Sequence, residues 1–188
     1  MAGKTDPQIV AEYLDLLEIE PGSVDVAVVL GELGRALAAA ADDIGHTGVV
    51  MPGIEAILTR IDTDPATVQT IVTGNIAPNA AVKLGALGLL RFFDLDTGAF
   101  GSDHADRRQL VGIAVARVAA RFGRHFAPEE IWVVGDAPND LVAARAAGAR
   151  CLLVGTGRIP VADLAALGPD AVLPDLADTD ALVELLAS

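Results

Sequence analysis

The stretch IWVVGDAPND, residues 131–140, decides the fold of this chain. It opens with four apolar residues, Ile131 to Val134, and a short run rich in β-branched types is typical of a buried parallel strand. Gly135 ends the strand, Pro138 suits the first turn of a helix, and Gly148 suits the end of that helix. The stretch therefore predicts a strand–turn–helix unit of an α/β protein.

Two carboxylates, Asp136 and Asp140, flank the turn of this unit. They lie near the carboxyl end of the strand, which is where ligands bind in open α/β sheets. Carboxylates that converge there can hold a hard divalent cation through oxygen. The same residues also suit a structural role, with Asp136 in the turn and Asp140 stabilising the helix through its dipole. The pair alone leaves both interpretations open.

The chain on either side of this unit shows two different patterns. After Gly48, strand-like and helix-like segments alternate, which predicts a doubly wound α/β fold with a parallel sheet covered on both faces. Strands are predicted at 67–72, 131–134, 150–154 and 171–173, an extended piece at 92–97, and helices at 54–61, 78–87, 107–122, 138–148, 161–167 and 179–186.

Before Gly48 the pattern predicts helices only. The first begins at Asp6-Pro7, with Asp6 as the capping side chain, and the second runs from about residue 24 to residue 44. The glycine-containing stretch 45–48 is the predicted boundary between this helical unit and the α/β unit.

The composition argues against a nucleic-acid-binding protein and against a membrane-spanning one. The chain has 188 residues, a net charge of −13 and no basic stripe, which argues against nucleic acid as a partner. The most apolar run, residues 24–41, contains charged residues and is not predicted to span a membrane. Cys151 is the only cysteine, so no internal disulfide forms, which fits a reducing cytoplasm; we expect this residue to be buried.

Polar groups follow three of the predicted strands or loops. Thr73, with Gly74 and Asn75, ends the strand 67–72 and can bind a phosphate oxygen through its hydroxyl and nearby N–H groups, or can simply cap the next helix. The adjacent Arg107 and Arg108 can neutralise a phosphate, or can be solvated at a helix start. The carboxylate pair of residues 136 and 140 is the third group.

In this order along the chain, the hydroxyl, the cation and the carboxylate pair resemble the haloacid dehalogenase (HAD) superfamily of phosphohydrolases. The resemblance is carried by IVTGN (71–75), GSDHADRRQLV (101–111), VVGDAPND (133–140), LVAARAAGA (141–149) and VGTG (154–157). The segment GKTDPQI (3–9) is similar to a helical cap of the phosphoglycolate phosphatase-like branch. The resemblance implies that residues 1–47 are a partial helical cap and residues 48–188 a HAD-like α/β core.

The resemblance also implies a role for each matching residue. Thr73, with Gly74 and Asn75, would bind the transferring phosphoryl group. Arg107 would stabilise its charge, with Arg108 as the alternative.

The other matching residues concern the metal and the cap. Asp136 would bind Mg²⁺, with Asp140 as a second carboxylate. Lys4 and Asp6 are candidates for substrate contact from the cap. Lys83, the only other lysine, is interpreted as a solvated helix residue.

One motif of the family is absent from residues 1–188. The family carries a D-x-D motif, whose first aspartate is the nucleophile, on a central first strand that precedes the cap. This chain has no such motif upstream of the cap; Asp94-Leu95-Asp96 is interpreted as the loop leading into the third strand, and Asp62-Thr63-Asp64 as a loop. We therefore expect the strands that end at Thr73 and Asp136 to face each other with unpaired edges, and Met1 to be a misplaced or truncated start.

The function implied by the resemblance is a cytoplasmic, magnesium-dependent phosphatase. The complete protein would hydrolyse a small phosphorylated metabolite through an aspartyl-phosphate, whereas the 188-residue chain would be inactive. A non-catalytic HAD-fold binding or interaction protein, and a haloacid dehalogenase, are the alternatives. No nucleic acid or membrane partner is expected, and the oligomeric state is open.

Overall fold

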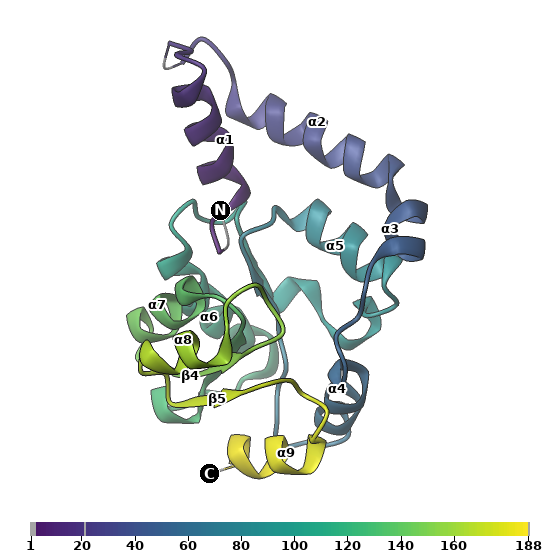
Figure 1. The fold of residues 1–188 in the computed structure, drawn as a ribbon, viewed down its shortest axis with the longest axis vertical. Helices are drawn as coiled ribbons and strands as arrows, with labels where there is room; N and C mark the ends of the chain where they lie inside the picture. Colours follow the sequence, from purple (N-terminus) through teal and green to yellow (C-terminus); the bar gives the residue numbers. More distant parts are fainter. Residues whose placement is uncertain (1–2, 21, 188) are drawn as a thin grey trace.

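The computed structural model describes residues 3–20 and 22–187 as an α/β core with a helical unit at one end (Figure 1). The α-helices are α1 (Asp6–Leu16), α2 (Val26–Ala39), α3 (Ala41–Thr47), α4 (Ile54–Asp62), α5 (Ala77–Ala86), α6 (Leu110–Phe122), α7 (Pro138–Ala146), α8 (Val161–Ala166) and α9 (Thr179–Ala187). The strands are β1 (Val72–Thr73), β2 (Ala99–Phe100), β3 (Trp132–Gly135), β4 (Arg150–Val154) and β5 (Ala171–Leu173). Short 3₁₀ turns occur at η1 (Leu90–Phe92), η2 (Leu95–Thr97), η3 (Arg107–Gln109) and η4 (Pro128–Glu130).

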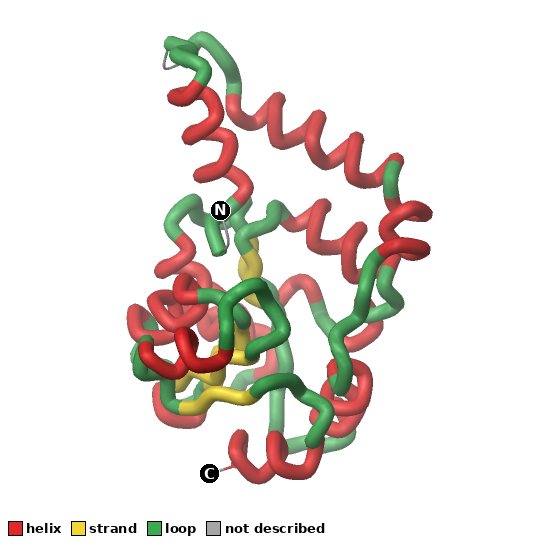
Figure 2. Tube along the Cα trace, viewed as in Figure 1, coloured by secondary structure: helices red, strands yellow, loops and turns green. Residues whose placement is uncertain are grey.

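The strands form two separate parallel sheets. β1 pairs with β2, and β3, β4 and β5 form the second sheet in that order, so the predicted parallel α/β class is confirmed. Within the described residues, β1 and β3 are not paired with each other. Figure 2 shows the strands as short yellow segments among the red helices. Among the residues described, the strand that ends at Thr73 and the strand that ends before Asp136 each have an edge without a strand neighbour, which agrees with the expected unpaired edges.

β4 organises the core because it is central in the larger sheet. Its residues point alternately to the two faces, as in any strand. Cys151 and Leu153 pack with the residues of α7 and α8, whereas Leu152 and Val154 pack with those of α4 and α9. Cys151 has no exposed surface, so its predicted burial is confirmed.

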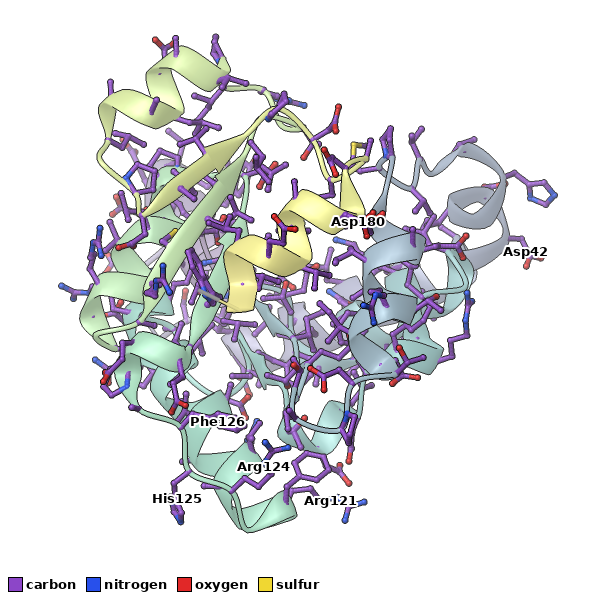
Figure 3. All side chains as sticks on the ribbon, turned by 90° about the horizontal axis from the view of Figure 1, so that it is seen from below. Asp42, Arg121, Arg124, His125, Phe126 and Asp180 are labelled. Carbon is purple, nitrogen blue, oxygen red and sulfur yellow. The ribbon has the colours of Figure 1, made fainter. Side chains whose placement is uncertain are left out.

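Helix α6 packs against both strands of the smaller sheet. Leu110 and Ala114, both buried, pack with Ala99 of β2. At the far end of α6, the Arg124 Nη1 donates to the Pro65 carbonyl at 2.9 Å, which holds the extended segment that leads to β1. Arg121, Arg124 and Phe126 lie together there, away from Asp42 of α3 (Figure 3).

The helical unit lies over α5 and is only lightly buried. Helices α1 and α2 pack on each other, and α2 and α3 pack on α5 (Figure 1). No residue of α2 or α3 is buried. No helix among the described residues combines the length and the apolar character needed to cross a membrane.

Four local predictions are corrected by the structure. The helix predicted from 24 to 44 is two helices, because the chain turns at Ala40. The strand predicted at 67–72 pairs only at 72–73, and the extended piece at 92–97 is mostly 3₁₀ turn, followed by the paired residues of β2. The cap of α1 is Thr5 rather than Asp6, since Thr5 Oγ1 accepts from the Gln8 N–H and the Gln8 side chain accepts from the Thr5 N–H.

Candidate active site

A buried ion pair joins the cation and one carboxylate of the predicted site. Arg107, on η3, donates through Nη2 to Asp140 Oδ1 at the start of α7. The side chains are 17% and 6% exposed. Asp140 Oδ2 accepts from the N–H groups of Asp136 and Ala137, each at 3.1 Å. Both oxygens of Asp140 are therefore satisfied by donors of the protein.

Gly135 makes room for this carboxylate. A Cβ added at Gly135 would lie 2.2 Å from the carboxyl carbon of Asp140, far closer than real Cβ contacts. Glycine at the end of β3 thus lets α7 fold back so that Asp140 accepts from the turn that precedes it. Packing against Asp140 therefore requires glycine at position 135, next to the carboxylate of Asp136.

Asp136 differs from Asp140 because its side chain is exposed. Among the described residues, its carboxylate accepts no hydrogen bond from a side chain or a backbone N–H. It lies against the loop after β4, where a Cβ at Gly157 would come 2.4 Å from Asp136 Oδ2. The structure therefore places Asp136 at the surface of the site, with its oxygens available to a ligand.

The adjacent arginines have different surroundings. Arg108 is 63% exposed and donates to both oxygens of Asp106. This hydrogen bonding lowers the pKa of Asp106 to about 2. Of the two arginines, Arg107 is the one that contacts Asp140, so the geometry distinguishes them where the sequence left both open.

Thr73 and Asn75 form a compact turn after β1. Thr73 Oγ1 accepts from the Asn75 N–H at 3.2 Å. Within the described residues, no hydrogen bond joins Thr73 to Arg107, Asp136 or Asp140. The structure thus brings Arg107 and Asp140 into contact and leaves Thr73 on the neighbouring sheet.

The beginning of the helical unit spans the edge between the two sheets. Gly3 lies against Asn139 of α7, and Gly74 lies against the Lys4 carbonyl, because a Cβ at either glycine would collide there. The Asp6 N–H donates to the Gly74 carbonyl at 2.7 Å. These contacts place residues 3–6 over the carboxyl ends of β1 and β3.

Asp6 is buried and binds the turn after β1. Its Oδ1 accepts from Asn75 Nδ2 at 3.0 Å. Its Oδ2 accepts from the Ile76 N–H at 2.9 Å and from Asn79 Nδ2 at 3.2 Å. Lys4 binds Glu12 instead. Contact of Lys4 and Asp6 with substrate stays a prediction; in this arrangement Asp6 joins the helical unit to the core.

Lys83 is the residue that the sequence analysis missed. Its Nζ donates to Asn75 Oδ1 at 3.0 Å, although its backbone lies two turns along α5. Side chains on a helix lean toward the N-terminal end, and a lysine is long enough to reach the turn that precedes the helix. The position of Lys83 two turns into the helix that follows the Thr73 turn was therefore the feature of the sequence that could have predicted this contact.

A small cavity adjoins the ion pair. It has a volume of about 350 Å³ and lies between the first turn of α1, η3 and α7. Gln8, Asp106, Arg107, Arg108 and Asn139 contribute to its lining. Because Asp106 already pairs Arg108 in this wall, Arg107 is the arginine that can meet a small anionic group in the cavity.

The carboxylates offer a limited donor set for a metal ion. No group of three histidine, cysteine, aspartate or glutamate side chains that could hold a metal occurs in the part of the chain that the structure describes. Of the two carboxylates, Asp140 is engaged on both oxygens, whereas Asp136 accepts no hydrogen bond from any described residue. Mg²⁺ commonly binds through one or two carboxylates together with phosphate oxygens and water, so this donor set fits magnesium with a phosphorylated ligand.

Part of the sequence matches a known protein family. Residues 107–179, which contain Arg107, Asp136 and Asp140, match the HAD-hydrolase-like family. No curated protein matches the sequence.

Several solved structures share the fold. A hydrolase from Pseudomonas syringae is 20% identical with a TM-score of 0.72, and the match covers 100% of this chain and 81% of that one. A HAD-like protein of unknown function from Agrobacterium tumefaciens is 20% identical with a TM-score of 0.61 and the same coverage. CbbY from Rhodobacter sphaeroides, solved with phosphate, is 21% identical with a TM-score of 0.67 over 93% of this chain and 75% of that one.

Proposed function

We propose that this chain, whose fold is that of the HAD-like hydrolases, carries the phosphoryl-binding site of a phosphomonoester hydrolase acting on a small phosphorylated metabolite. Thr73, Gly74 and Asn75 would bind the phosphoryl oxygens on one side, and Arg107 would neutralise their charge on the other. The phosphate bound to the structurally similar CbbY supports this class of ligand.

The observation that carries the proposal is the state of Arg107. Its Nη2 is bound to Asp140, whereas its Nε is buried and has no acceptor among the described residues. A buried donor without a partner costs about 1–3 kcal/mol, so such a group is rare without a reason. An anion beside Arg107 would supply the acceptor.

Magnesium fits the same site through Asp136. The exposed carboxylate would hold the ion, and Asp140 would keep the turn of residues 135–137 in place through its two N–H contacts. A bound Mg²⁺ would neutralise phosphoryl charge during transfer. The protein's own contribution is to orient the carboxylate and to keep Arg107 facing the ligand.

We further propose that the 188-residue chain binds phosphate without hydrolysing phosphomonoesters. Hydrolysis of the HAD type would need an aspartate nucleophile, which would form an aspartyl-phosphate. Asp94 of the Asp94-Leu95-Asp96 sequence accepts from Arg121 Nε at 3.1 Å, near the end of α6, whereas Arg107 precedes the start of α6. This pair is therefore remote from Arg107 and is not the nucleophile pair.

The test measures binding and turnover separately. Titration calorimetry with orthophosphate, with and without MgCl₂, should detect binding that magnesium strengthens. A panel of phosphomonoesters should yield no phosphate above the uncatalysed rate. Arg107→Gln should abolish binding, whereas Arg108→Gln, which removes the same charge from an exposed pair, should retain it.

Two outcomes would contradict the proposal. Absence of orthophosphate binding by the folded wild-type chain would overturn the phosphoryl-binding site. Turnover of a phosphomonoester at rates usual for enzymes would overturn the proposed inactivity and would require a nucleophile within residues 1–188.

A further inference from the structure

We propose that Lys83 is a second cationic ligand-binding residue of this site, held in place by Asn75 so that its ammonium group contacts the bound anion. This inference rests on the proposed phosphoryl site. It adds a residue from α5, a helix that contributed none of the cations predicted from the sequence.

The side-chain amide of Asn75 positions the Lys83 ammonium group. The oxygen and the nitrogen of this amide each have a hydrogen-bond partner. Asn75 Oδ1 accepts from Lys83 Nζ at 3.0 Å, and Asn75 Nδ2 donates to Asp6 Oδ1 at 3.0 Å. The carboxylate of Asp6 requires the amide nitrogen on its side, so the amide oxygen must face Lys83. The hydrogen bond to Asp6 therefore determines which way the Asn75 amide is oriented.

The same residue connects Lys83 to the predicted phosphoryl ligand Thr73. The backbone N–H of Asn75 donates to Thr73 Oγ1 at 3.2 Å, while its side chain binds Lys83. A single residue thus lies between the hydroxyl and the ammonium group. An anion bound by the Thr73 turn would lie within reach of a lysine side chain anchored on that turn.

The charge of Lys83 is not compensated within the described residues. The other lysine, Lys4, is bound by both carboxylate oxygens of Glu12. Lys83 makes no ion pair with any described residue and contacts a neutral amide. The chain has 26 acidic residues and a net charge of −13, so carboxylates are abundant, yet the Lys83 ammonium group is bound by an amide.

This arrangement suits ligand binding because it leaves donors available. An ammonium group has three N–H donors, and Asn75 takes one of them. A carboxylate partner would compete with a bound anion, whereas an amide positions the lysine without cancelling its charge. Asp6 acts as a positioning residue, since it contacts Asn75 rather than the ligand.

The experiment compares orthophosphate binding by four folded proteins. Wild-type chain, Lys83→Gln, Lys83→Arg and Arg35→Gln are titrated with orthophosphate in MgCl₂ by calorimetry. Arg35 is an exposed residue of α2 paired with Glu32, so Arg35→Gln removes one positive charge away from the site. Lys83 is exposed, and circular dichroism should confirm that its variants are folded.

A direct contact predicts a specific pattern. Loss of one charge-assisted hydrogen bond should weaken orthophosphate binding about tenfold in Lys83→Gln. Lys83→Arg should recover most of the affinity, and Arg35→Gln should bind like wild type. Because the chain has only two lysines, reductive ¹³C-methylation gives few resonances, and the Lys83 methyl resonance should shift saturably with orthophosphate.

The outcomes separate this inference from the proposed function. If wild type and Lys83→Gln bind orthophosphate equally, Lys83 is not a ligand-binding residue, and the proposed function stands. If Arg35→Gln weakens binding as much as Lys83→Gln, the effect is one of net charge and the inference fails. If the wild-type chain does not bind orthophosphate, both are wrong.

Discussion

Asp6 and Asn75 join the helical unit to the core through a hydrogen bond of 3.0 Å between the Asp6 carboxylate and the Asn75 amide. The same carboxylate accepts from the Ile76 N–H and from Asn79 Nδ2. One buried side chain thus meets three donors at the turn after β1 and the start of α5. These contacts help to hold α1 over the site, together with the hydrogen bond from the Asp6 N–H to the Gly74 carbonyl.

Replacement of Asp6 by asparagine should loosen the helical unit. Asparagine has a single acceptor oxygen, and its amide nitrogen would face another donor. We expect a loss of about 1–3 kcal/mol in the free energy of unfolding, because buried donors lose their acceptor. Hydrogen exchange should become faster throughout α1.

The matched control is Asp15→Asn, an exposed aspartate of the same helix. It should leave both the free energy of unfolding and the exchange of α1 nearly unchanged. Equal effects of the two substitutions would mean that the Asp6 contacts do not hold α1 on the core.

The capping of α1 shows what the sequence did and did not reveal. The Thr5-x-x-Gln8 spacing is a capping box, and it could have been read before the structure. Assigning the cap to Asp6 concealed the tertiary role of that carboxylate. The partners of Asp6 lie about 70 residues away in the chain, and no local pattern specifies them.

The pattern of apolar residues predicted some strands better than others. β4 occurs where the sequence predicted it, because a buried parallel strand is recognisable as an apolar run. β5 also occurs at the predicted residues, although its three residues are only half-buried. β1 pairs over two residues only. The length of the pairing is decided by the partner strand, and the sequence of residues 67–72 carries no information about that partner. The Arg107–Asp140 contact likewise depends on the packing of η3 against α7 rather than on spacing.

Gly135→Ala should destabilise the protein by roughly 2–4 kcal/mol, because the new methyl group would collide with the Asp140 carboxylate. Urea unfolding measures the change. Gly112→Ala, on the exposed face of α6, is the control: its Cβ would meet no atom within 4 Å, and alanine is the better helix former by about 1 kcal/mol. The two Gly→Ala changes should therefore have opposite signs. Destabilisation by both would refute the assigned role of Gly135.

Removing Arg107 should cost much more stability than removing Arg108. Arg107→Met leaves the Asp140 carboxylate buried without its cation, which typically costs about 3–5 kcal/mol. Arg108→Met breaks an exposed pair and should cost under about 1 kcal/mol.

A double-mutant cycle with Asp140→Asn identifies the pair. If Arg107 and Asp140 interact as the structure shows, the double variant should be less destabilised than the sum of the two single variants. Additive effects would indicate that the two side chains do not interact.

Cys151 should make stability fall at alkaline pH. Burial raises the pKa of its thiol from 9.0 to about 12. Between these values the unfolded chain loses the thiol proton while the folded chain keeps it, so the folded state binds more protons and stability decreases as pH rises. The contribution approaches about 1.4 kcal/mol per pH unit at most.

The measurement is the difference in unfolding free energy between wild type and Cys151→Ala from pH 8 to pH 11. Subtracting the variant removes the titration of other groups. The wild-type chain should lose stability more steeply than the variant above about pH 9, the ordinary pKa of the thiol. Parallel pH profiles would show that the Cys151 thiol ionises in the folded protein.

The unpaired edge of β3 should be visible in hydrogen exchange. β4 is paired on both sides, whereas within the part of the chain that the structure describes β3 is paired only with β4, and Val134 of β3 is 45% exposed. Because amides of a parallel strand point alternately to its two sides, about half of the β3 amides should exchange fast while the β4 amides are protected. Equal protection of the two strands in the isolated chain would mean that a further segment pairs with β3 in solution.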